Sequence, residues 1–117
     1  QAGQRLGRQM AAFHNTYDAL LTPALGTLPP KLGWIDMMLE DADEYWRLVF
    51  TFSPFTVWFN ITGQPGITLP MGMSEFGLPI SVQLVARFGD EATLLRLASQ
   101  LEEARPWDDR RPPIVTG

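Results

Sequence analysis

The stretch N-I-T-G-Q-P-G-I-T-L-P-M-G-M-S-E-F-G-L-P-I-S-V-Q-L-V-A, residues 60–86, predicts the organising unit of this chain. Gly63 ends a helical segment, because glycine readily adopts the left-handed conformation that closes a helix. A proline–glycine pair then leads into a strand at 66–70, and apolar and polar residues alternate along a second strand at 79–86. The connection at 71–77 contains two glycines, which favours a loop longer than a tight hairpin turn. Two neighbouring strands of this kind need helices to cover them.

The spacing of apolar residues and the positions of proline and glycine divide the rest of the chain into elements. In order, we predict a helix at 5–17, a strand at 18–22, a loop at 23–35, helices within 40–62, strands at 66–70 and 79–86, a helix at 91–104 and a tail at 105–117. Ser53 and Pro54 predict the cap and the first residue of the second helix within 40–62, and Asp90 predicts the cap of the helix at 91–104. No cap precedes the first helix, so we expect it to continue a longer one. The predicted fold class is α/β, with helices flanking a short mixed β-sheet.

The composition excludes several classes of protein. The chain has 117 residues, enough for one domain, of which 45% are apolar, and its net charge is -4. The nine basic residues form no stripe, which argues against a nucleic-acid partner. No run is long and apolar enough to cross a membrane, and cysteine is absent. We therefore expect a globular protein of the cytoplasm, with no nucleic-acid partner and no membrane partner.

A few polar residues are candidates for a site. Thr22 and Pro23 could form a pocket wall, because a loop that leaves the end of a buried strand often does so, although Pro23 could simply end the strand. His14, the only histidine, has no visible catalytic partner, and we interpret it as a surface or boundary residue. Gln83 lies on an apolar strand, which favours a buried amide over a surface residue. The acids between residues 36 and 44 lack the pattern of a calcium loop, so we predict no metal site.

Aromatic residues crowd the region between residues 46 and 59. They are Trp46, Phe50, Phe52, Phe55, Trp58 and Phe59. Residues 55–62 are also apolar on nearly every side of a helix, as in a helix buried inside a protein. This apolar surface exceeds what the rest of a 117-residue chain can cover. We therefore expect a larger missing body or a partner chain, and self-association of the isolated chain through this face.

Several separated groups of residues agree in order and spacing with a known family. They are Y-D-A-L-L-T-P at 17–23, S-P-F-T at 53–56, N-I-T-G-Q-P at 60–65, G-L-P-I-S-V-Q-L-V at 77–85, G-D-E and L-L within 89–95, and P-W at 106–107. Together they resemble the C-terminal end of the amidase signature enzymes, over nearly the whole chain. The family usually has alanine at Gly66 and glycine at Ser81, and its glutamine-processing members tend to carry an acid just before the Phe-Thr pair. The S-P-F-T and T-G-Q-P groups are more similar to the branch that contains 6-aminohexanoate-cyclic-dimer hydrolase.

This resemblance implies an amide hydrolase that cleaves a non-peptide C–N bond and is built on a large mixed sheet. It also implies a serine nucleophile, a second serine on a cis peptide and a lysine, which in the family lie far upstream of the matching residues. The four serines here are isolated, and Lys31 is the only lysine. We therefore expect a C-terminal segment that contributes sheet and pocket rim, is inactive alone and has no cofactor. Within it, we expect Thr22, Pro23, Trp58 and Asn60 to line or shape the pocket for a small-molecule amide substrate.

Other interpretations stay open. Trp58 could belong to the core instead, and Asn60 could tie the helix end to the following turn. The whole chain could be a free-standing interaction or dimerisation module that is derived from an amidase and has no catalytic activity. A small enzyme that uses acids such as Asp36 or Glu75 is a third alternative, but no pair of carboxylates has a visible partner.

Overall fold

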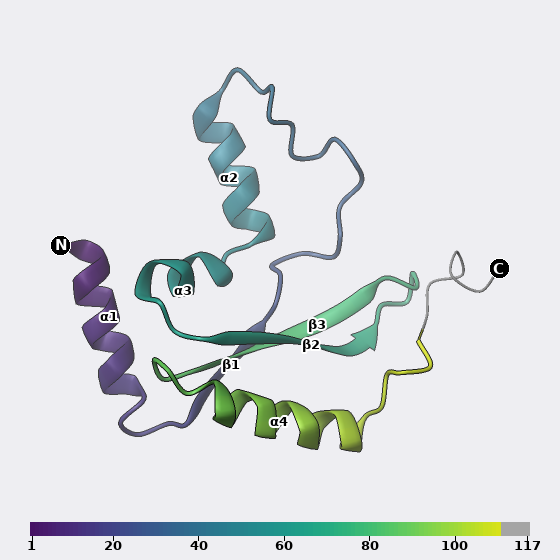
Figure 1. Cartoon of the computed structure of the whole chain (residues 1–117). Coiled ribbons are helices and arrows are strands. Elements are labelled where there is room, and N and C mark those ends of the chain that lie inside the picture. Colours follow the sequence, from purple (N-terminus) through teal and green to yellow (C-terminus); the bar gives the residue numbers. More distant parts are fainter. Residues whose placement is uncertain (111–117) are drawn as a thin grey trace.

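Strand β3 (Pro79–Ala86) is the middle strand of a small sheet in the computed structural model, which describes residues 1–110. It pairs with β1 (Ala19–Pro23) on one side and with β2 (Gly66–Met73) on the other. Both pairings are antiparallel, and the strand order is β1-β3-β2. Helices lie on both faces of the sheet (Figure 1), which confirms the predicted α/β class.

Helix α4 (Glu91–Ala104) covers one face of the sheet and forms the main core with it. Every second side chain of β3 faces this helix, as the alternation in the sequence predicts. The core residues are Leu69, Leu84, Ala86, Leu94 and Ala98. Asp90 begins the helix by accepting a hydrogen bond from the backbone N–H of Thr93 at 3.3 Å, which confirms the predicted N-cap.

Helix α3 (Thr56–Thr62) lies over the other face, and helix α1 (Ala2–Phe13) packs against it (Figure 1). Gly63 ends α3 with a φ angle of 78°, which confirms the predicted left-handed stop. Under this cover the side chain of Val85 is 0% exposed. The second half of β3, residues 83–86, is therefore buried on both faces, while β1 and β2 are the edge strands.

The structure divides residues 40–62 differently from the sequence prediction. Helix α2 (Ala42–Phe52) ends at Ser53, whose backbone N–H completes its last turn. Pro54 disfavours helical geometry in the residue before it, so α2 stops there. Helix α3 begins only at Thr56. The prediction that Ser53 caps the second helix, with Pro54 as its first residue, is therefore wrong.

Other boundaries also differ from the sequence expectation. Helix α1 ends at Phe13, because residues 14–16 form a turn and not a fourth helical turn. Strand β2 continues past residue 70 to Met73, because a bulge between Pro70 and Gly72 adds one residue and lets the pairing resume. The connection to β3 is therefore shorter than predicted. Residues 111–117 of the predicted tail lie outside the described part of the chain.

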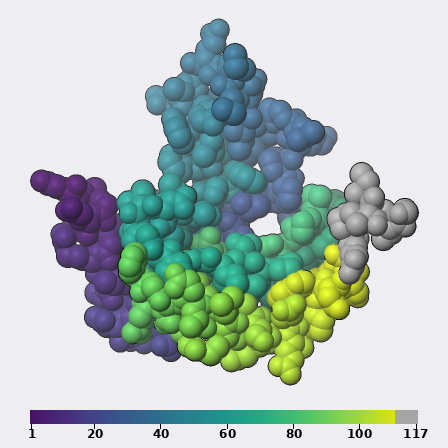
Figure 2. Space-filling view, in the orientation of Figure 1, coloured from purple at the N-terminus to yellow at the C-terminus, as the bar shows by residue number. Residues whose placement is uncertain are grey.

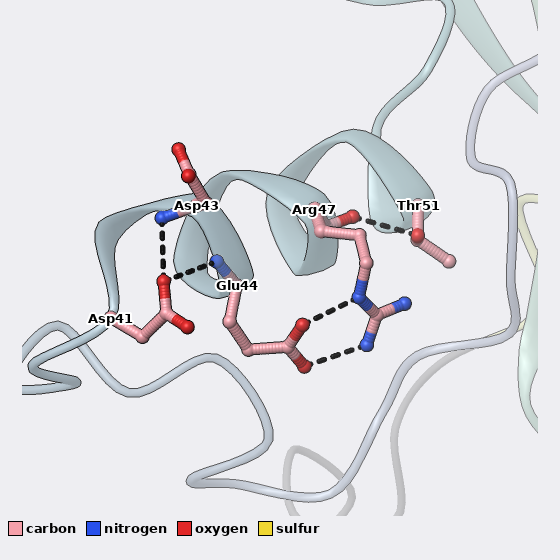
Figure 3. A network of polar contacts seen from close by, with 5 residues as sticks. All are labelled: Asp41, Asp43, Glu44, Arg47 and Thr51. Atoms are coloured by element: carbon pink, nitrogen blue, oxygen red, sulfur yellow. Dashed lines mark hydrogen bonds and ion pairs between the residues drawn. The ribbon is translucent and has the colours of Figure 1, made fainter.

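Helix α2 is held by contacts within itself (Figure 3). Asp41 caps it by accepting hydrogen bonds from the N–H groups of Asp43 at 3.0 Å and Glu44 at 3.1 Å. Arg47 donates to both carboxylate oxygens of Glu44, at 2.6 and 2.7 Å, and Thr51 Oγ1 donates to the carbonyl of Arg47. Hydrogen bonding to Arg47 lowers the pKa of Glu44, so this ion pair weakens as the pH falls through that pKa.

The described chain is more open than a compact domain of its length. Its radius of gyration is 16.8 Å, whereas about 13 Å is expected for a compact domain of this size. Helix α2 and the loop before it project as an arm from the body (Figure 2). Trp46 is 53% exposed and Phe50 46%, as the surplus of aromatic residues predicts. No helix among residues 1–110 combines the length and apolar character of a membrane span.

We expect the two N-caps to differ in their effect on stability. Asp90→Ala removes the cap of a helix that forms the core, so the free energy of unfolding falls by about 1 kcal/mol. Asp41→Ala removes an equivalent cap from α2, which packs on neither the sheet nor α4. It should lower the helical circular dichroism signal and leave the unfolding of the sheet unchanged. Equal losses in the free energy of unfolding of the two variants, measured in denaturant, would contradict this expected difference.

Candidate functional site

A hollow of about 480 Å³ lies where the end of β1, the start of α3 and the β2–β3 hairpin meet. The 23–29 segment forms one wall of it. The remaining wall residues are Thr56, Thr68, Pro79, Ile80 and Ser81. Proline, leucine and isoleucine side chains therefore surround a few hydroxyl groups, a composition that suits a small molecule with an apolar chain and one polar group.

The structure places one of the four predicted site residues in the wall of this hollow and a second next to it in the chain. Pro23 belongs to its wall, and Thr22 precedes it on β1. Thr22 lies directly opposite Gln83 of β3, and Thr68 of β2 lies opposite Gln83 on the other side. Opposite residues of antiparallel strands point to the same face of a sheet. The three side chains therefore form one polar row across the sheet, beside the hollow.

Helix α3 places a fourth polar side chain over this row. Thr56 Oγ1 donates a hydrogen bond to Gln83 Oε1 at 3.3 Å. Gln83 is only 5% exposed, which confirms the prediction of a buried amide. Its Nε2 and the Oγ1 of Thr22 are buried and have no hydrogen-bond partner among the described residues. The two are a donor and an acceptor on facing positions of neighbouring strands.

The other two predicted residues lie elsewhere. Trp58 lines a smaller hollow of about 250 Å³ between α3 and α1, and it is 50% exposed, so it is not a core residue of this chain. Asn60 is exposed on α3, and its side chain makes no hydrogen bond within residues 1–110. Thr62 makes the expected tie instead, because its hydroxyl donates to the side chain of Gln64 in the following turn. The predicted tie by Asn60 is therefore wrong.

His14 is buried, which corrects the prediction of a surface or boundary residue. It is 2% exposed, and its Nδ1 contacts the backbone carbonyl of Tyr17 at 3.1 Å. Arg87 lies in the turn between β3 and α4, and its Nη2 donates a hydrogen bond to the backbone carbonyl of His14 at 3.1 Å. These contacts lock the end of α1 against that turn. His14 thus holds two elements together and faces no nucleophile.

The hydroxyl groups at the hollow have no catalytic partner in the described chain. Ser81 is the only serine in its wall, and no hydrogen bond joins a serine to Lys31 or to His14 among residues 1–110. A serine nucleophile needs an adjacent base and donors for an oxyanion. The hollow can therefore bind and orient a ligand, but these residues do not assemble a nucleophile.

The wall residues that the sequence did not indicate include three with hydroxyl groups, Thr56, Thr68 and Ser81. Thr68 and Ser81 alternate with core residues along β2 and β3, so they belong to the face away from α4. The alternation along the two strands could have indicated from the sequence that both residues lie on this face. For Thr56 no local signal exists, because its place depends on how α3 folds back over the sheet.

Comparison with known proteins identifies the family. The Amidase family model matches residues 1–95. The 6-aminohexanoate-cyclic-dimer hydrolases of Paenarthrobacter ureafaciens and of Pseudomonas sp. (strain NK87) are each 42% identical over 105 residues, which are 85% of this chain and 21% of theirs. The solved structure of 6-aminohexanoate cyclic dimer hydrolase superposes with a TM-score of 0.80 and 37% identity over 97% of this chain and 24% of that one.

A second solved structure agrees. One subunit of the glutamyl-tRNA(Gln) amidotransferase of Thermotoga maritima superposes with a TM-score of 0.71 and 27% identity, over 90% of this chain and 21% of that one. The chain thus spans about a fifth of the length of the curated relatives that it matches. Sequence, shape and family model agree over most of its residues, and the chain belongs to the amidase family.

Proposed function

We propose that this chain is the C-terminal part of an amide hydrolase that cleaves a non-peptide C–N bond in a small molecule. The observation that carries the proposal is the match over nearly the whole chain, at a TM-score of 0.80, to about a quarter of a hydrolase that acts on a cyclic amide. In this role the chain supplies sheet and pocket rim. The nucleophile and its base come from the other part of the enzyme, so the chain is inactive alone.

Exposed aromatic side chains support the proposal that this chain is one part of a larger domain. Trp46, Phe50 and Trp58 are each about half exposed, although large aromatic side chains normally stabilise a fold or an interface by being buried. Burying such a surface requires more protein than the described chain supplies. The remaining part of an amidase domain would cover it.

Thr22 and Pro23 fit the rim of the substrate pocket in this proposal. Pro23 lines the hollow and Thr22 precedes it on β1, where apolar walls and hydroxyl groups could hold the chain of a small amide. The part of Trp58 and Asn60 in substrate binding stays a prediction, since both lie away from this hollow. A location in the cytoplasm stays part of the proposal, and cell fractionation of the source organism would test it.

We expect this chain to replace the matching segment of a relative and so to restore its activity. The region of the Paenarthrobacter ureafaciens hydrolase that precedes its matching segment would be expressed as a separate chain together with the chain described here. The two chains should co-purify, and only the pair should hydrolyse 6-aminohexanoate cyclic dimer, because each half lacks what the other supplies.

The matching segment of the Paenarthrobacter hydrolase itself is the positive control for this experiment. If that segment binds and restores turnover while the present chain does neither, the proposal is wrong. Amide hydrolysis by the present chain alone would also contradict it, above all if Ser53→Ala or Ser81→Ala abolished the activity.

We expect the rim of the hollow to control substrate affinity in the reassembled enzyme. A Cβ atom on Gly26 would lie 2.4 Å from the carbonyl oxygen of Thr51, so Gly26→Ala must push the 23–29 segment away from α2. Displacing pocket groups by about 1 Å can cost on the order of 100-fold in rate, so kcat/KM should fall at least about tenfold. Gly72→Ala is the control, because no atom lies within 4 Å of its added Cβ. Equal kinetics for both variants would contradict the assignment of this rim.

The second candidate function is a free-standing interaction module, which the exposed arm favours. The rings of Trp46 and Phe50 lie 5.8 Å apart on one side of α2 and form an apolar patch. In either case we expect the isolated chain to self-associate through this patch. Light scattering should show dimers or larger species that the pair Trp46→Asp and Phe50→Asp dissociates.

Phe76→Asp is the matched control for self-association. Phe76 is a 74% exposed aromatic residue in the hairpin turn, away from the arm. The Phe76→Asp substitution should leave the self-association unchanged. A monomer at all concentrations, with little binding of an apolar dye, would exclude association through the arm. Tight dimers of this chain that fail to complement the hydrolase would favour the interaction module over the enzyme.

A further inference from the structure

A second hollow, of about 570 Å³, lies where α1, the end of α3 and the β3–α4 turn meet (Figure 1). It shares no described lining residue with the hollow at the end of β1. Two arginines, Arg8 and Arg87, belong to its wall, and its described lining contains no acidic residue. The chain as a whole has a net charge of -4. A cationic hollow in an acidic chain is suited to an anion.

One face of α1 forms a wall of this hollow. Residues 4, 7, 8 and 11 recur at helical spacing, so their side chains share that face. Gly7 and Ala11 are small and leave space there, and a Cβ atom on Gly7 would meet no atom within 4 Å. Arg8 is exposed, and no ion pair or side-chain hydrogen bond within residues 1–110 involves it. Its guanidinium is therefore available to a ligand.

Arg87 is held in place on the opposite wall. Its Nη2 donates to the backbone carbonyl of His14 at 3.1 Å, and its Nε lies 4.0 Å from a carboxylate oxygen of Asp90. A guanidinium has five N–H donors, so several remain for a ligand. Gln64 adds another donor, because its Oε1 accepts from the hydroxyl of Thr62 and its Nε2 has no partner within the described chain. The wall thus presents N–H groups from two arginines and one glutamine.

A buried ring nitrogen lies at the same place. His14 belongs to the lining and is 2% exposed. Its Nδ1 donates to the carbonyl of Tyr17, so its Nε2 is an acceptor, and this Nε2 has no hydrogen-bond partner among residues 1–110. Unpaired buried polar atoms are rare in folded proteins, and bound water or ions commonly account for them. This nitrogen is a second, independent indication that a polar molecule belongs in the hollow.

We propose that this hollow binds a small organic carboxylate, with its charged end between Arg8 and Arg87. A guanidinium binds a carboxylate through two parallel N–H···O bonds. Asp90 beside Arg87 would repel a second negative charge, which favours a monoanion. The hollow has the size of a small-molecule site, about 300–1,000 Å³, and Phe88, 78% exposed, offers its ring to the apolar part of the ligand. The site is independent of the proposed function.

Titration with benzoate tests the site. The chain would carry Trp46→Asp and Phe50→Asp, which lie on α2 outside the hollow and keep it monomeric. Calorimetry should give a Kd of about 1 mM or lower, and the side-chain amide of Gln64 should shift in nuclear magnetic resonance spectra. Benzyl alcohol has the same ring without the charge, and inorganic phosphate has charge without a ring. Both should bind at least about tenfold more weakly than benzoate.

Matched substitutions on α1 test the residues. Arg8→Gln removes one guanidinium and should weaken benzoate binding at least about tenfold. Arg5→Gln removes the same charge from the same helix, but Arg5 lines the smaller hollow beside Trp58. It should change the Kd by no more than about twofold in about 0.15 M salt, which screens distant charges. Gly7→Leu should abolish binding by filling the hollow, while circular dichroism shows an intact helix, because leucine favours helices more than glycine does.

Several results would overturn the site. They are equal losses for Arg8→Gln and Arg5→Gln, unchanged binding to the Gly7→Leu variant, and a Kd for benzyl alcohol as low as that for benzoate. Equal binding of inorganic phosphate would overturn the assignment to an organic carboxylate. The chain paired with the Paenarthrobacter part should bind benzoate with the same Kd within about threefold. Loss of binding there would show that the rest of the domain fills the hollow and would overturn the site. Failure of that pair to form would count against the proposed function alone, because the titration of the single chain decides the site.

Discussion

The confinement of the second half of β3, residues 83–86, on all four sides is the constraint on which the rest of the described chain depends. Its backbone pairs with β1 and β2, and its side chains alternate between the core under α4 and the face under α3. Buried backbone groups must be paired, so both neighbouring strands are needed wherever β3 is inaccessible to water. The side chains then select the covering helices, because one face is aliphatic and the other carries Gln83. Fixing this one strand thus fixes the position of every element except α2.

The polar row shows why the face under α3 differs from an ordinary core. Leaving a buried donor or acceptor unpaired costs about 1–3 kcal/mol, whereas the aliphatic face beneath α4 carries no such penalty. Thr56 pairs with one end of the Gln83 amide, and Thr22 lies opposite the other end. A row of this kind holds three strands and a helix in one arrangement only. Within the row, the side chain of Gln83 is buried and links α3 to the sheet beside the hollow.

The sequence predicted those features that depend on neighbouring residues and missed those that depend on distant ones. The alternation along β3, the left-handed Gly63 and the cap at Asp90 are local, and each was confirmed. Pro54 is compatible with the start of one helix or with the end of another. The structure shows that it follows the end of α2. His14 is buried by Arg87, which lies far along the chain, so no nearby residue indicated its burial. At the site, Pro23 could be found as a strand end, whereas Thr56 reaches the hollow through the fold alone.

Helix α2 shows what local interactions can and cannot do. Asp41 provides its cap and Arg47 its ion pair, but an exposed pair of this kind contributes only about 0.2–1 kcal/mol. The helix has 11 residues, and isolated helices shorter than about 12–15 residues are marginal in water. Packing of an amphipathic face normally supplies the missing stability, yet Trp46 and Phe50 on that face stay about half exposed among residues 1–110. In the proposed hydrolase, the remaining part of the domain would supply this packing to α2.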